Sequence, residues 1–358
     1  MIVKLVTINF QYKVLGLDLQ QLYLTIMKKI YYLFVLISTF SLAQTKSHVE
    51  VFLPDLFSQF LHVRDLSISN DQTELYFTVE GFKKEFSFIA FSKKKNGIWQ
   101  QPTVAPFSGM DKDLEPFLSP DNLKLFFASN RNTAENKEKK DMDIWFVERT
   151  STTSEWSEPK NIGAPINTDK DEFYPSVAAN GNLYYTASIT ENTKGKEDIY
   201  KSELINDVYQ KPASLSKNIN SETYEFNAYI SPDEHTIIFS SYQRSDSFGG
   251  TDLYISSKDE NGNWQPGENL GENINSDKID YCPFVDFNTN TFYFTSERSQ
   301  QNKFYSKQLS LNEILSEMNS IPNGLSRVYK LDISKSKNWE LKKGLYLIKI
   351  KHGSMKKQ

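Results

Sequence analysis

Four acidic residues recur at one position of an internal repeat, and they are the side chains of this chain best suited to bind a ligand. They are Asp113, Glu172, Glu225 and Asp280, each three residues before the proline or alanine that opens an apolar strand, whereas Val63 takes this place in the first copy. Equivalent positions of a closed repeat meet near its axis, where four carboxylates raise one another's pKa unless a cation or basic ligand neutralises them. Oxygen ligands of this kind suit calcium. The alternative is that each acid accepts backbone N–H groups within its own connector and only fixes the spacing of the repeats.

Other reactive motifs are missing from the sequence. It contains no His-Glu-x-x-His pair, no cysteine cluster, no Gly-x-Ser-x-Gly elbow and no phosphate-binding glycine loop. Cys282 is the only cysteine, so it cannot form an internal disulfide and is expected to be a buried apolar side chain. A glycosidase requires two carboxyl groups with different roles, whereas a repeated acid favours binding. We therefore expect no enzyme activity, and no cofactor apart from the possible calcium ion.

The elements that would position these acids are written five times along the chain. In each copy an apolar strand ends in a turn rich in Ser, Pro, Asp, Asn or Gly, and a second strand rich in Phe and Tyr follows. One aromatic per copy marks the register, at spacings of 50, 58, 54 and 55 residues. A fixed period of this size is typical of a repeat architecture. The five marker residues are Phe77, Phe127, Tyr185, Phe239 and Phe294.

The rest of each copy predicts two more strands. A third strand begins with Asp, an aliphatic residue and an aromatic residue, as in Asp143-Ile144-Trp145, and a fourth strand follows. Four-stranded units that close into a ring protect their edges without helices. We therefore predict an all-β fold, a β-propeller of five four-stranded blades. Six blades are the alternative, with residues 327–333 and 345–350 as a degenerate sixth.

The fifth copy departs from the pattern. Phe304-Tyr305-Ser306 stands where its third strand is expected, no fourth strand follows, and residues 310–319 predict a short helix with a Ser310–Glu313 capping box. The missing strand is expected at the other end of the chain, where residues 51–57 would pair with the last blade and close the ring. The predicted propeller spans residues 44–310, and residues 311–358 form a short helix with C-terminal strands or a tail.

Two other repeated side chains have structural explanations. An Arg follows the second strand in several copies, and its spacing predicts ion pairs within one blade, Arg131 with Asp143 and Arg244 with Asp252. A Trp recurs at one position, for which we expect packing between blades rather than sugar stacking. The Trp residues are Trp99, Trp156 and Trp264.

These motifs together resemble a known family. Over roughly residues 65–306 the chain is similar to the WD40-like PD40 repeat of TolB-type propellers. The similarity is carried by the Ser-Pro-Asp turn, the aromatic second strand, the Arg after it and the Asp-Ile-Tyr third strand, as in Asp198-Ile199-Tyr200. The resemblance implies an exported bacterial propeller. Such propellers serve as interaction modules of the cell envelope or as non-catalytic domains fused to enzymes. No peptidoglycan-binding or peptidase domain is recognisable in this chain.

The N-terminal residues 1–43 predict export. The order of a signal peptide is followed here by a basic segment, Met27-Lys28-Lys29, an apolar run, residues 30–40, and a small-residue cleavage site, Ser41-Leu42-Ala43. Met27 is the expected start. The run is short for a membrane span, so no integral span is expected after cleavage. An uncleaved anchor is the alternative. Four of the 41 basic and one of the 45 acidic residues lie in 1–43, which leaves 37 basic and 44 acidic residues in the mature chain. Its net charge of −7 argues against nucleic acid as the partner.

Two functions follow from these features. The first is an exported, non-catalytic propeller, periplasmic or attached to the outer membrane or cell surface, that binds a cell-envelope protein, peptide or glycan through its channel face. The alternative is a carbohydrate-active hydrolase or lyase on the same scaffold. Residues 342–357 are similar to the last strands of a type IX secretion sorting domain, which would imply delivery to the cell surface; a plain edge strand or basic tail is the other interpretation.

Overall fold

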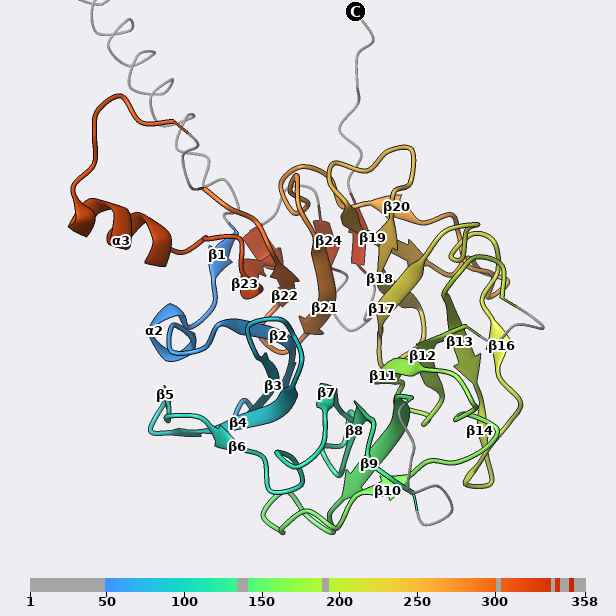
Figure 1. The fold of residues 1–358 in the computed structure, drawn as a ribbon. Helices are drawn as coiled ribbons and strands as arrows, with labels where there is room; N and C mark the ends of the chain where they lie inside the picture. Colours follow the sequence, from blue (N-terminus) through green and yellow to red (C-terminus); the bar gives the residue numbers. More distant parts are fainter. Residues whose placement is uncertain are drawn as a thin grey trace, which may run out of the picture. The chain divides into compact units, whose positions relative to one another are not determined.

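The computed structural model describes residues 49–133, 141–188, 193–300, 304–335, 339–341 and 348–350. The predicted signal peptide, the start at Met27 and most of the C-terminal segment lie outside these residues. The described residues belong to the compact unit Ser47–Gln358, which is a β-propeller of five antiparallel blades (Figure 1). No helix among them is long and apolar enough to cross a membrane.

The first two blades each follow the order of the chain. In blades 1 to 4 the first strand is innermost, and the second and third strands lie progressively further out. The second strands have apolar and aromatic centres, such as Leu125-Phe126-Phe127 in β8, which suit a sheet buried on both faces. Blade 1 contains β2 (His62–Ile68), β3 (Glu74–Glu80), β4 (Ser87–Lys95), β5 (Ile98–Trp99) and β6 (Thr103–Val104), and blade 2 contains β7 (Asp113–Leu118), β8 (Lys124–Ser129), β9 (Asp143–Glu148) and β10 (Lys160–Asn161).

Blades 3 and 4 repeat this order. Blade 3 carries an extra two-stranded ribbon, β14 (Leu204–Ile205) with β15 (Val208–Tyr209), between its third and fourth strands. Blade 3 contains β11 (Glu172–Val177), β12 (Leu183–Ala187), β13 (Asp198–Ser202) and β16 (Ala213–Ser214), and blade 4 contains β17 (Glu225–Ile230), β18 (Thr236–Tyr242), β19 (Thr251–Ser257) and β20 (Glu268–Asn269).

Blade 5 joins the two ends of the described chain. Its strands are β21 (Asp280–Asp286), β22 (Thr291–Ser296), β23 (Arg327–Asp332) and the N-terminal β1 (Glu50–Val51), which pairs antiparallel with β23. The prediction of five blades closed by an N-terminal strand is therefore confirmed. The innermost strands contact one another in sequence and β21 contacts β2, which completes the ring.

Three details of the predicted closure are wrong. Phe304-Tyr305-Ser306 forms no strand, and the third strand of blade 5 is β23, so the propeller continues beyond residue 310. Residues 51–57 are not one strand, because Leu53 adopts a left-handed φ of 45° and Pro54 starts the short helix α2 (Pro54–Phe57). Residues 327–333 belong to blade 5 and not to a sixth blade.

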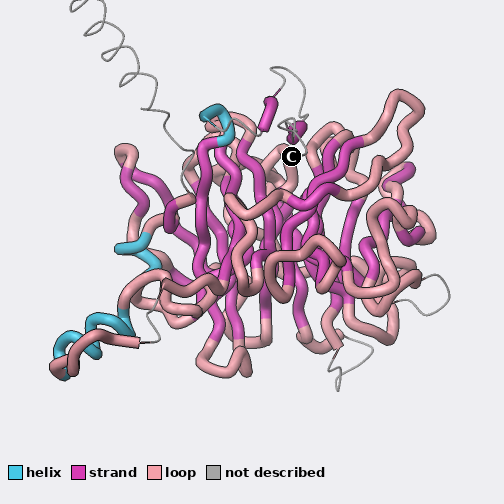
Figure 2. Tube along the Cα trace, turned by 90° about the horizontal axis from the view of Figure 1, so that it is seen from above, coloured by secondary structure: helices cyan, strands magenta, loops and turns pink. Residues whose placement is uncertain are grey.

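The predicted helix is present as α3 (Leu311–Asn319), an insertion between β22 and β23. The Ser310 side chain accepts from the Glu313 backbone N–H and the Glu313 carboxylate accepts from Ser310, which completes the capping box. The helix lies outside the ring of blades (Figures 1 and 2), and its apolar face, residues 311, 314, 315 and 318, is exposed. The remaining elements are η2 (Ile333–Lys335), β24 (Trp339–Leu341) and β25 (Ile348–Ile350).

Every innermost strand contains a β-bulge at the same place. The pairing with the second strand shifts register there, and one residue of each bulge adopts a positive φ, which is unusual outside glycine. The bulge brings side chains of all five blades toward the axis. The residues with positive φ are Asp65 (57°), Glu115 (62°), Tyr174 (48°), Asn227 (49°) and Cys282 (53°).

Hydroxyl groups join neighbouring blades along the innermost strands. Ser67 Oγ accepts from the Leu118 N–H at 2.9 Å, and Ser176 Oγ accepts from the Ile230 N–H at 2.9 Å. These bonds satisfy buried N–H groups that face away from their own sheet. The strands run between two opposite layers of loops (Figure 2). We call the layer that contains the turns between first and second strands the turn face.

Candidate functional site

The four acids predicted to bind a ligand lie at the start of the innermost strands of blades 2 to 5, and all are fully buried. Asp113 accepts from Ser108 Oγ (2.7 Å) and from Arg131 Nη2 (2.6 Å). Asp280 likewise accepts from the Ser276 backbone N–H (2.5 Å) and from Arg298 Nη2 (2.8 Å).

The other two acids bind their own connectors in the same way. Glu225 accepts from Ser221 Oγ (2.8 Å), Ser241 Oγ (2.7 Å) and Arg244 Nη2 (3.0 Å). Glu172 accepts from Thr168 Oγ1 (2.6 Å). The geometry favours the structural alternative, in which each acid fixes its connector to its own blade. The described residues contain no group of three or more His, Cys, Asp or Glu side chains placed to hold a metal ion, and calcium binding stays a prediction.

The predicted ion pairs of the repeated Arg are wrong. Arg131 binds Asp113 instead of Asp143, and Arg244 binds Glu225 instead of Asp252. The register explains the error for Arg131, because Ser129 of the middle strand pairs with Asp113 on one side and with Asp143 on the other, so spacing alone cannot choose between them. The third-strand acids are engaged by the fourth strand: Asn161 donates to Asp143 (2.6 Å) and Asn269 donates to Asp252 (2.9 Å).

Two of the repeated Trp side chains pack between neighbouring blades, as expected. The indole N–H of Trp156 in blade 2 donates to the Tyr76 hydroxyl in blade 1 at 3.0 Å. Trp264 of blade 4 is buried in one cluster with Tyr184 of blade 3.

A pocket opens on the axis at the turn face, at the other end of the innermost strands from the four acids. Its volume is about 410 Å³, in the lower range of small-ligand sites. Every blade contributes the same apolar position to its wall, which places the pocket on the axis of the ring. These five residues are Ile68, Leu118, Val177, Ile230 and Val285.

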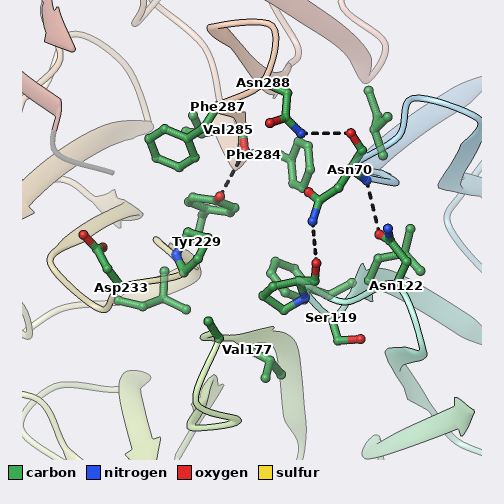
Figure 3. Close-up of a pocket in the computed structure, with 17 residues that line it drawn as sticks. Asn70, Ser119, Asn122, Val177, Tyr229, Asp233, Phe284, Val285, Phe287 and Asn288 are labelled. Carbon is green, nitrogen blue, oxygen red and sulfur yellow. Dashed lines mark hydrogen bonds between the residues drawn. The ribbon is translucent and has the colours of Figure 1, made fainter. Parts of the chain in front are cut away.

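Aromatic side chains from three blades complete the pocket. Phe117, Tyr229 and Phe284 share one position of blades 2, 4 and 5, and Tyr229 lies 6.2 Å from Phe117 and 5.6 Å from Phe284 between ring centroids. The Tyr229 hydroxyl donates to the Val285 carbonyl oxygen at 3.0 Å, so it is held across blades 4 and 5 (Figure 3). The pocket is therefore lined mainly by apolar groups held rigidly by the scaffold.

Hydrogen bonds between turns hold one side of the rim. Asn122 Oδ1 accepts from the Asn70 N–H (3.2 Å), Asn288 Nδ2 donates to the Asn70 carbonyl oxygen (2.8 Å), and the Asn70 amide donates to the Pro120 carbonyl oxygen (Figure 3). Asp233 lies on another side of the rim and carries the one charge among the described residues that line the pocket. These bonds join blades 1, 2 and 5 at the mouth.

Glu234 holds the turn that carries Asp233. It adopts a φ of 55°, and its carboxylate reaches into blade 3, where it accepts from Tyr184 Oη (2.7 Å) and Asn180 Nδ2 (2.8 Å). Asn182 Nδ2 also donates to it at 3.1 Å, and Lys201 Nζ lies 3.3 Å away. Burial disfavours the charged form, but these partners outweigh burial and lower the pKa of Glu234 to about 2.

A buried polar cluster surrounds Arg64 on the bulged parts of the innermost strands. The guanidinium donates to Asp65 Oδ1 (2.9 Å) and to Glu115 Oε1 (2.8 Å), and it lies 3.6 Å from Cys282 Sγ. Burial raises the pKa of Glu115 to about 8, and Arg64 acts against that shift. Burial also raises the pKa of the Cys282 thiol well above its ordinary value, which agrees with the expectation of a buried, unreactive side chain.

Glu115 compensates for a missing hydroxyl. In blades 1 and 3 a threonine hydroxyl of the second strand accepts from the backbone N–H of the positive-φ residue in the next blade: Thr78 Oγ1 from Glu115 and Thr186 Oγ1 from Asn227. In blade 2 the equivalent second-strand residue is Ala128, which has no hydroxyl. The Tyr174 N–H of blade 3 donates instead to Glu115 Oε2 at 2.7 Å, and Asn227 of blade 4 donates to Glu115 Oε1 at 3.3 Å. Glu115 thus links four blades through Arg64, Tyr174 and Asn227.

The sequence reasoning missed both the axial pocket and this cluster. The pocket was detectable as the apolar position five residues after the predicted acid, or after Val63 in the first copy. The cluster was detectable as the place two residues after that acid, where the five copies carry five different side chains. A position that differs in every copy of a repeat departs from the symmetry of that repeat.

Comparisons with known proteins agree on the fold. No protein-family model and no curated protein sequence matches the chain. The structure is similar to a thermostable family-43 glycoside hydrolase (TM-score 0.50, 11% identity, 83% of this chain and 95% of that chain). It is also similar to TolB from Acinetobacter baumannii (0.43, 12%, 75% and 54%) and to a family 117 glycoside hydrolase from Zobellia galactanivorans (0.47, 12%, 82% and 92%). The chain spans about half the length of the TolB structure, and at these identities the likeness concerns the fold alone.

Proposed function

We propose that this protein is an exported, non-catalytic β-propeller that binds a protein or peptide of the cell envelope in its axial pocket. The observation that carries the proposal is the pocket itself. All five blades contribute to it, its wall is apolar and aromatic, and hydrogen bonds between turns fix its rim. Rigid, concave and mostly apolar sites with a few polar groups are the usual form of binding sites.

The chemistry of the pocket supports binding over hydrolysis. Glycoside hydrolysis requires two carboxyl groups on either side of the bond that is cleaved. Among the described residues that line the pocket, Asp233 alone has a carboxyl group. Asp65 and Glu115 form a second pair of acids, but both are buried and both bind Arg64.

A pair of matched substitutions tests the proposal. Ala179 is exposed at the pocket, whereas Ala213 is exposed on β16, the outermost strand of the same blade. We expect Ala179→Trp to obstruct the pocket and to remove an envelope partner recovered by affinity purification from native cells, and Ala213→Trp to retain it. Retention of every partner by Ala179→Trp would refute the proposal.

The hydrolase alternative makes a different prediction. A screen of purified protein against envelope and plant glycans would detect turnover, and Asp233→Asn or Glu115→Gln would abolish it. We expect no turnover of any glycan by the unmodified protein.

A further inference from the structure

Arg327 is the one arginine of this chain that pairs with no carboxylate among the described residues. The sequence contains six arginines, and the structure describes all of them. Each of the other five forms an ion pair at 3.0 Å or less with a buried Asp or Glu. The five pairs are Arg64 with Asp65, Arg131 with Asp113, Arg149 with Glu74, Arg244 with Glu225 and Arg298 with Asp280.

The guanidinium of Arg327 is nevertheless buried, because the residue is only 4% exposed. Nη1 donates to the backbone carbonyl oxygens of Leu61 and Ser326, whereas no described group accepts from Nε. Burial lowers the pKa of Arg327, and Tyr329 opposes this shift without the help of any carboxylate in the described chain. A buried charge is costly unless a group of opposite charge neutralises it, so Arg327 requires an anion that this chain does not supply.

The charge at this place is reversed relative to the other blades. Arg327 opens β23, where the third strands of blades 2 to 4 carry Asp. There the carboxylate is held by donors of its own blade: Asp252 accepts from the backbone N–H groups of Phe248 (2.8 Å) and Gly249 (3.1 Å). Blade 5 therefore has a cation in place of an anion, without an acid beside it to compensate.

The surroundings of Arg327 are mainly cationic. His62 Nδ1 accepts from the Ser326 backbone N–H at 3.3 Å, which leaves the imidazole proton on Nε2. Burial lowers the pKa of His62, and the nearby cations Lys84 and Arg327 lower it further. Glu297 acts in the opposite direction, but its carboxylate is engaged by Lys84 (2.9 Å) and by the Ser326 hydroxyl (3.1 Å). The local field therefore attracts an anion.

Arg327 also lies where the ring of blades closes. It belongs to blade 5, and Leu61, whose carbonyl oxygen accepts from Nη1, directly precedes β2 of blade 1. We infer that the Arg327 guanidinium binds a small anion, such as chloride, at the junction of blades 5 and 1. The bound anion neutralises the buried charge and stabilises the ring closure, as a carboxylate does for the other arginines.

This site is separate from the axial pocket and does not depend on the proposed function. Arg327 pairs with Ser296, at the end of β22 away from the turn face, whereas the pocket opens at the turn face. Failure of the anion site would therefore leave the proposed function as it stands.

Thermal unfolding of the full-length protein in sodium chloride and in sodium gluconate of equal ionic strength tests the inference. A ligand that binds only the folded state raises the midpoint, and gluconate is too large to reach a buried guanidinium. We expect the midpoint to rise and saturate with chloride, and at about 200 mM salt to exceed that in gluconate by about 3 °C or more. Equal midpoints in the two salts would overturn the inference.

Two substitutions on β23 locate the anion. Arg327→Met removes the guanidinium and should abolish the difference between chloride and gluconate. Lys330→Met removes a partly exposed charge that pairs with Glu50 at 3.0 Å, and it should retain the difference. An undiminished difference in Arg327→Met, or its loss in both variants, would show that the anion does not bind at Arg327.

Crystals of the unmodified protein grown in sodium bromide give a direct readout that requires no variant to fold. Bromide replaces chloride in such sites and scatters anomalously. We expect an anomalous peak at hydrogen-bond distance from Arg327 Nε. An ordered water in that position, with no bromide, would contradict the assignment.

Discussion

Replacing Glu234 by glutamine should destabilise the propeller in a way that depends on pH. The carboxylate joins the Asp233 turn of blade 4 to Tyr184, Asn180 and Asn182 of blade 3, and its pKa falls from an ordinary 4.5 to about 2. Since each pH unit between the two values corresponds to about 1.4 kcal/mol, the ionised carboxylate stabilises the fold by about 3 kcal/mol.

The sign of the pH dependence follows from the lowered pKa. The folded state holds this proton less tightly than the unfolded state, so the stabilisation is complete above pH 4.5 and is lost as the pH falls through 2. By linkage the contribution at pH 3 is about 1.5 kcal/mol. The difference in unfolding free energy between the unmodified protein and Glu234→Gln should therefore shrink by about half between pH 6 and pH 3.

Urea unfolding followed by tryptophan fluorescence measures this difference at the two pH values. Glu260→Gln, at an exposed turn position, is the control and should change the unfolding free energy by less than about 0.5 kcal/mol. A difference for Glu234→Gln that is below about 1 kcal/mol at pH 6, or that does not change with pH, would mean that the ionised carboxylate does not stabilise the fold.

Three other predictions concern the axial cluster, the ring closure and export. Glu115→Leu removes the acceptor of buried donors on other blades, among them Arg64 and Tyr174, and should lower the unfolding free energy in urea by about 3 kcal/mol or more. Glu115→Gln keeps an acceptor oxygen and should lower it clearly less. Equal losses for the two variants would contradict the compensating role of Glu115. Phe52→Ala, at a buried side chain beside β1, should lower the unfolding free energy by about 3 to 5 kcal/mol. Phe304→Ala, at a side chain that is 91% exposed, should leave it almost unchanged. Similar losses for the two variants would show that β1 does not close the ring. N-terminal sequencing of the protein recovered from its native cells should begin at Gln44, and a chain that begins at Met27 or earlier would refute signal cleavage.

The sequence predicts the repeated part of this fold well, because each blade repeats the same local patterns. The marker aromatics Phe77 and Phe239 lie on second strands as expected, and the N-terminal residues complete the last blade. The prediction failed at β23 because the α3 insertion separates it from β22, and because Arg327 stands where the third strands of blades 2 to 4 carry Asp. Val328-Tyr329 keeps the aliphatic–aromatic pair and could have identified this strand.

The site was harder to predict because several acids repeat with the same period. Asp113 and Asp121 recur equally well along the chain. Spacing does not show that Asp113 is buried against an Arg and that Asp121 is exposed in a turn. That difference arises from the direction of the innermost strand, whose start is packed against its connector and whose end opens on the axial pocket. The bulge that brings Glu115 to the axis likewise depends on a positive φ that its residue type does not favour.

Photo-crosslinking from the axial pocket shows whether a partner binds there. A benzoylphenylalanine in place of Ala179 should form a covalent product with one envelope protein or peptide in native cells, identifiable by mass spectrometry, and the same group in place of Ala213 should not form it. The same product from both positions, or a product from position 213 alone, would contradict the account.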